Sequence, residues 1–175
     1  MMKTILFILL GIIGHVILGN ELSLESIKRE SEIKIVHTAH EGIRLFIKSI
    51  DGKEKAINHT EFTAICSKGC IKIKKSYFTG KDDTIFKEEN GTTREYISLW
   101  KDLLNIGLED LDSLPLDEAV DPFEFIDSWR IDQDTFNFHF KAENRMISFN
   151  LYDIDSYRDK RFKMILNRVM FFFGE

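Results

Sequence analysis

The sequence predicts an α+β fold: an antiparallel β-sheet built from hairpins and a three-stranded meander, with two amphipathic helices packed on it. Three observations support this prediction. Asp51-Gly52 separates two extended runs and is typical of a tight hairpin. Residues 136–140, Phe-Asn-Phe-His-Phe, alternate apolar and polar side chains, as a half-buried strand does. Residues 96–104 instead repeat apolar side chains at helical spacing.

The first residues of the chain predict export. Lys3 precedes an apolar stretch from Thr4 to Gly19, and polar residues follow, which is the layout of a signal peptide. The stretch is shorter than the ~20 apolar residues that a membrane-spanning helix needs. We therefore expect a signal peptide at 1–19, a polar lead-in at 20–32 and a single domain at 33–175. A secreted or periplasmic location follows, with an uncleaved N-terminal anchor as the alternative.

Composition narrows the classes of protein. The net charge is −5, and it becomes −6 when the signal peptide and its one base, Lys3, are removed. Nucleic-acid binding is not expected, because such proteins concentrate positive charge. The chain has 15 Phe and only 2 Pro, which favours one well-packed domain over disorder. No membrane span is expected in the mature chain.

The first half of the chain predicts strands, a loop and a helix. Four strands are expected among residues 33–78, including a hairpin around Asp51-Gly52. Residues 79–93 are polar, contain glycine at two points and are expected to form a long loop. Thr92 and Glu95 then form a capping-box pattern, so a helix is expected from there to Gly107.

The second half predicts the meander and the closing helix. The meander strands are expected at 123–131, 136–140 and 147–151, separated by short turn-prone segments. The alternating phenylalanines are interpreted as core rather than as a ligand-binding surface. The final helix is expected to open at Asp155-Ser156 and to run to about Phe173.

The only two cysteines, Cys66 and Cys70, are predicted to form a disulfide. A three-residue hairpin loop of Ser67, Lys68 and Gly69 would place them opposite each other, with β-carbons ~4.5–5.5 Å apart. A disulfide needs ~3.5–4.5 Å, and an oxidising compartment would favour it. A structural zinc site needs four ligands, and a single pair of cysteines supplies only two. Neither a metal nor a cofactor is therefore expected. Free thiols and pairing with another chain are the alternatives.

Histidines supply the candidates for a chemical site. His37 and His40 lie three residues apart, but no glutamate stands between them, so the zinc-protease motif is absent and exposure is expected. His59 is a further histidine without a motif. His139 is expected on the face of its strand opposite the phenylalanines, either exposed or beside an acid.

Two sequences match the acceptor pattern for N-glycosylation. They are Asn58-His59-Thr60 and Asn90-Gly91-Thr92, and both are expected in loops. They matter only if the source glycosylates exported proteins. Lysines at positions 68, 72, 74 and 75 are interpreted as the protective charges of an edge strand, or alternatively as a docking surface for an acidic partner.

These observations favour a non-enzymatic exported domain that binds a protein partner or a cell-envelope component. One alternative is a small extracytoplasmic hydrolase that uses His37, His40 or His139 with an acid. The other is a secreted effector or inhibitor. Neither the ligand nor the oligomeric state follows from the residues.

Overall fold

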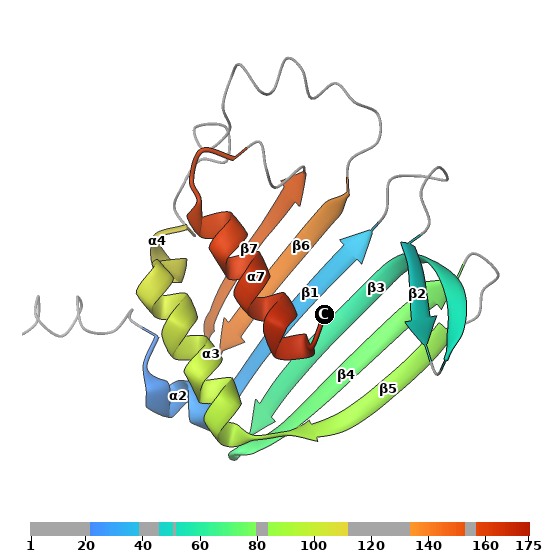
Figure 1. Cartoon of the computed structure of the whole chain (residues 1–175). Helices are drawn as coiled ribbons and strands as arrows, with labels where there is room; N and C mark the ends of the chain where they lie inside the picture. The colour runs from blue at the N-terminus through green and yellow to red at the C-terminus, as the bar shows by residue number, and fades with distance from the viewer. Residues whose placement is uncertain (1–21, 39–45, 51, 80–83, 112–133, 153–156) are drawn as a thin grey trace, which may run out of the picture.

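The computed structural model describes residues 22–38, 46–50, 52–79, 84–111, 134–152 and 157–175. The predicted signal peptide, His40 and the first meander strand at 123–131 lie outside these residues. A seven-stranded antiparallel sheet carries helices against one face, as Figure 1 shows. The predicted α+β fold is confirmed. None of the helices in the described part of the chain is long and apolar enough to cross a membrane.

The strands follow the order β5-β4-β3-β1-β6-β7, and β2 pairs with the first part of β3. Their bounds are β1 (Glu30–Thr38), β2 (Phe46–Ile50), β3 (Lys53–Ser67), β4 (Cys70–Thr79), β5 (Thr84–Gly91), β6 (Thr135–Ala142) and β7 (Arg145–Tyr152). The helices are α2 (Leu24–Arg29), α3 (Thr93–Ile106), α4 (Leu108–Leu111) and α7 (Arg161–Phe173).

The predicted hairpin at Asp51-Gly52 is confirmed. Ile50 of β2 pairs directly with Lys53 of β3, so only two residues connect the strands. Gly52 has φ +75°, the left-handed conformation that this turn requires. β3 continues from this hairpin to Ser67, because its later residues pair with both β1 and β4.

The predicted start and stop of α3 are also confirmed. The Thr92 hydroxyl accepts a hydrogen bond from the Glu95 backbone N–H at 3.2 Å and donates to the Glu95 carboxylate at 2.6 Å. Gly107 ends the helix with φ +93°. The buried face of α3 consists of Tyr96, Leu99, Trp100 and Leu103, at the spacing read from the sequence.

Two expectations about the chain ends need correction. The lead-in at 20–32 contains α2, capped by Ser23, and the start of β1, because Ile27 is buried in the core. The final helix begins at Arg161 and not near residue 155, since residues 157–160 are not helical. Its end at Phe173 agrees with the prediction.

The expected loop at 79–93 is wrong, because it contains β5. Residues 86–90 of this strand are exposed and lack an apolar alternation, so the sequence carries no strand signal there. Pairing with β4 and ion pairs hold β5 in place; Lys75 lies 3.3 Å from Glu89 and Lys72 lies 3.9 Å from Glu88. The lysines of β4 are therefore not on an edge strand, and glutamates on β5 balance two of them.

The interpretation of the phenylalanines of β6 as core is confirmed. Phe138 and Phe140 are buried; Phe138 stacks with Phe149 of β7 at a ring-centroid distance of 5.0 Å, and Phe140 lies tilted against the same ring at 6.0 Å. Trp100 of α3 packs edge-on against Phe140, and Phe162 of α7 against Phe149. The two helices thus cover the sheet through a continuous layer of aromatic rings.

The predicted disulfide is wrong: Cys66 and Cys70 are free. The hairpin turn has two residues, 68–69, both with positive φ (50° and 77°), and not three. In this register Cys66 lies opposite Ile71, and Ser67 lies opposite Cys70. Because side chains alternate between the two faces of a sheet, the shift of one residue buries Cys66 in the core and leaves Cys70 exposed on the other face.

The two thiols should therefore differ in reactivity. Cys66 donates from its buried sulfur to the Lys28 backbone carbonyl at 3.2 Å, whereas Cys70 is open to solvent. We expect a thiol-specific reagent to modify one cysteine in the native protein and both after unfolding. Cys70→Ser should leave no reactive thiol in the native state. An unreduced protein with no reactive thiol even after unfolding would contradict the observed register.

Candidate functional site

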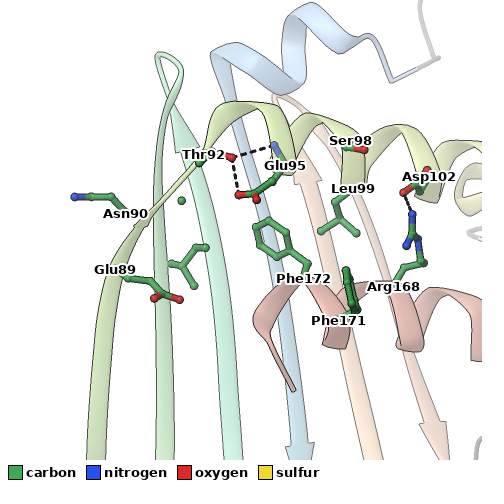
Figure 2. A pocket seen from close by; sticks show the side chains of 12 residues that line it. Glu89, Asn90, Thr92, Glu95, Ser98, Leu99, Asp102, Arg168, Phe171 and Phe172 are labelled. Carbon is green, nitrogen blue, oxygen red and sulfur yellow. Dashed lines mark hydrogen bonds and ion pairs between the residues drawn. The ribbon is translucent and has the colours of Figure 1, made fainter.

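A cleft of about 400 Å³ lies between α3, α7 and the end of β5. It forms where β5 passes through Gly91 and Thr92 into α3, while the last turn of α7 comes down beside it (Figure 2). The capping box fixes the junction between β5 and α3, and the aromatic core fixes the position of α7. The lining combines apolar side chains of the core with charged residues at the rim.

The floor and one wall of the cleft are apolar. Ile73, Leu99 and Phe172 line it from β4, α3 and α7, and Phe171 stands at its rim with 76% of its surface exposed. Gly91 allows this close packing, because a β-carbon there would come within 2.9 Å of Ile73. Large aromatic side chains in such positions supply most of the contact area in binding sites.

The charged residues of the cleft form local pairs. Arg168 of α7 forms an ion pair with Asp102 of α3, which joins the two helices as Figure 2 shows. Glu89 pairs with Lys75 of β4 at 3.3 Å. Glu95 accepts from the neutral Thr92 hydroxyl, and no base among the described residues pairs with it. The lining therefore contains three carboxylates and one guanidinium.

His37 lies on the covered face of the sheet, at the end of β1. Its Nε2 atom is 3.2 Å from Asp134 Oδ2, and its ring stacks on Phe136 with centroids 4.2 Å apart. Only 14% of its side chain is exposed, so the expectation that it faces solvent is wrong. Burial lowers the pKa of His37 below its ordinary value of 6.5, although Asp134 acts in the opposite direction.

The lowered pKa predicts that stability depends on pH through His37. The unfolded chain binds a proton at higher pH than the folded protein does, so the stabilisation is complete above pH ~6.5 and is lost as the pH falls through the folded pKa. We expect the free energy of unfolding to decrease between pH ~7.5 and ~5, and His37→Gln to reduce this decrease. Urea unfolding at both pH values, with an NMR titration of the imidazole, measures it. An imidazole that titrates above 6.5 in the folded protein would contradict the prediction.

His59 lies on the opposite, uncovered face of the sheet, within a chain of polar contacts. Thr38 Oγ1 is 2.9 Å from His59 Nδ1, His59 Nε2 is 3.4 Å from Glu61 Oε1, and Lys34 is 3.0 Å from Glu61 Oε2. Burial alone would raise the pKa of Glu61, but hydrogen bonds from Lys34 and His59 outweigh it and lower that pKa. This hydroxyl–imidazole–carboxylate order is the one that activates a nucleophile, and the sequence did not single out His59.

The remaining candidates are scattered. His139 shares the uncovered face, as expected, but contacts the Ser148 hydroxyl at 3.0 Å and not an acid. Asn58 and Asn90 lie within β3 and β5, so the expectation of loops is wrong; Asn58 occupies a bulge and Asn90 lines the cleft. His37 and His139 are on opposite faces and form no common site. No group of three or more potential metal ligands occurs within the ranges that the structure describes.

No protein-family model matches this chain, and no curated protein matches it in sequence. A function must therefore be inferred from the chain's own side chains. One feature of the sequence could have indicated the cleft. Three consecutive phenylalanines end α7, and a helix packed on one sheet can bury only part of such a run. Phe173 is buried, while Phe171 and Phe172 reach the cleft.

Proposed function

We propose that this chain is an exported binding domain without catalytic activity, and that its binding surface is the cleft between α3, α7 and β5. The observation that carries the proposal is Phe171, an aromatic side chain that is three-quarters exposed at the rim of a cleft with an apolar floor. Exposed aromatic residues at such positions are the usual anchors of protein–protein contacts. The partner is a protein or a component of the cell envelope.

The polar residues of the cleft also favour binding over chemistry. Arg168 and Asp102 neutralise each other, and Glu95 is engaged in the cap of α3. Such groups hold the two helices in place and orient a ligand. Export is supported by the N-terminal sequence, in which Lys3 precedes an apolar stretch. Mass spectrometry of material from the native source should show a mature N-terminus at Asn20; an intact Met1 in the cytosolic fraction would contradict export.

Removal of Phe171 should weaken binding without harming the fold. A photo-crosslinking amino acid at exposed Asn105, about one turn beyond Asp102, should capture the partner in the native source. We expect Phe171→Ala to reduce capture and affinity about tenfold, because anchor residues contribute ~1–2 kcal/mol or more. The free energy of unfolding should change by only ~0.5 kcal/mol, since the ring is exposed.

The matched control is Phe86→Ala. Phe86 is also a largely exposed phenylalanine, but it lies on the uncovered face of β5, where its neighbour is Lys74. Capture by this variant should equal that of the unmodified protein. Equal loss in both variants, or loss in neither, would contradict a binding role for the cleft.

The alternatives have narrower support. A hydrolase would use Thr38, His59 and Glu61, but Glu61 also pairs with Lys34, and the cleft lies on the other face of the sheet. An effector or inhibitor would use the same cleft, and the identity of the captured partner distinguishes this role: an enzyme blocked by the captured protein makes the chain an inhibitor.

A further inference from the structure

We propose that the cleft recognises a lysine or arginine side chain within an extended segment of a partner protein. This inference rests on the binding role proposed above and specifies the chemistry of its ligand. It depends on three features of the described residues: the excess of carboxylates in the lining, the two aromatic rings beside them and the free edge of β5.

The charges of the lining favour a cation. Glu89, Glu95 and Asp102 face the cleft with Arg168 as the one base. Asp102 is neutralised by Arg168 and Glu89 is balanced by Lys75, but the Glu95 carboxylate has only the Thr92 hydroxyl as a partner among the described residues. No basic side chain among the described residues therefore balances its negative charge, which attracts a cation to the mouth of the cleft.

The aromatic rings favour the same ligand. Phe171 and Phe172 line the cleft together with Glu95, and the faces of aromatic rings attract ammonium and guanidinium groups. A side chain of this kind also has an apolar stem, for which Leu99 and Ile73 provide a matching floor. The combination of ring, carboxylate and apolar floor fits a lysine or arginine side chain better than a purely apolar residue.

The helix ends reinforce this preference in part. α7 ends at the cleft, and the C-terminal end of a helix carries partial negative charge that favours cations. α3 begins there, and the partial positive charge of its N-terminus has the opposite effect. The preference for a cation therefore depends on the carboxylates of the lining and on the end of α7.

The free edge of β5 indicates that the cation belongs to an extended peptide segment. β5 pairs with β4 on one side and with no strand on the other within the described part of the sheet. An extended segment that adds to this edge would present alternate side chains to the helix-covered face. Glu89 projects on that face and lines the cleft, so we infer that a long side chain of such a segment extends past Glu89 into the mouth of the cleft.

The test uses two capped peptides of equal length, one of alternating leucine and lysine and one of alternating leucine and glutamate, titrated into the ¹⁵N-labelled full chain. We expect the lysine peptide to shift the resonances of cleft residues, and the glutamate peptide to bind at least about tenfold more weakly. Glu95→Gln should raise the Kd of the lysine peptide about three- to tenfold. A capping box accepts glutamine, so the helix start is preserved. Phe171→Ala should have a similar effect.

The outcomes separate this inference from the proposed function. Two results would contradict a cationic ligand while leaving the cleft as a binding surface. One is equal affinity of the two peptides for the cleft, and the other is a Kd of the lysine peptide that Glu95→Gln does not change. If the lysine peptide does not bind, while capture of the native partner still depends on Phe171, the proposal of a cationic ligand is likewise wrong. If neither the peptide nor the partner depends on Phe171, the binding role of the cleft itself fails.

Discussion

Phe138→Ala is expected to lower the free energy of unfolding by about 3–5 kcal/mol, the largest effect of any single substitution considered for this chain. Phe138 is fully buried in the middle of β6 and stacks with Phe149 at 5.0 Å and with Phe140 at 6.1 Å. Alanine would lose this contact area and leave a cavity, because strands on both sides fix the backbone and prevent collapse. Small domains have only ~5–15 kcal/mol of stability, so the variant should be close to unfolding at physiological temperature.

Urea unfolding followed by circular dichroism measures this effect, and Phe86→Ala again provides the control. Both positions are phenylalanines on strands, but Phe86 is 60% exposed, so its loss should cost only ~0.5 kcal/mol. Similar losses in the two variants would contradict the register of β6, because a shift of one residue would turn Phe138 away from the helices.

Ser31→Ala is expected to lower the free energy of unfolding by about 1–3 kcal/mol through a buried hydrogen-bond network. The Ser31 hydroxyl donates to the Ile27 carbonyl at 2.7 Å and accepts from the Tyr96 hydroxyl at 3.0 Å, so it joins α2 to α3 at the start of β1. Tyr96 is fully buried, and burial raises the pKa of its hydroxyl, which is therefore a neutral donor. Removal of Ser31 deprives this donor of its acceptor in the protein interior.

A double-mutant cycle distinguishes this network from simple packing. Tyr96→Phe should cost less than Ser31→Ala, about 0.5–1.5 kcal/mol, because Ser31 keeps its bond to Ile27. The double variant should cost less than the sum of the two single variants, since removal of both partners leaves no unsatisfied donor. Additive losses would show that the two hydroxyls do not interact.

The elements that the sequence predicted are those whose signals are local. The Asp51-Gly52 turn depends on residues that tolerate positive φ, and the capping box at Thr92 and Glu95 satisfies backbone groups within one helical turn. Alternation in residues 136–140 reports directly which side chains face the core. In each case a short window contains both the residues and their partners, so no tertiary information is needed.

The elements that were missed depend on partners far along the chain. β5 is a charged edge strand, and it is extended because β4 supplies hydrogen bonds and counter-charges to it. Cys70 faces solvent because the turn has two residues and not three, a choice of register that involves Lys28 and Arg29 of α2 through their contacts with the turn. His37 is buried because Phe136 of β6 and Asp134, which directly precedes that strand, cover it from about one hundred residues away in the sequence.

By itself, the sequence determined the α+β class, the aromatic core and the helix caps, because patterns of period two and 3.6 and the chemistry of turns act over a few residues. Only the tertiary structure decided the strand order, the free thiols and the cleft. Glu95 of α3 is distant in sequence from Arg168 and Phe171 of α7, and only the packing of α7 beside α3 and β5 brings them together around one cavity.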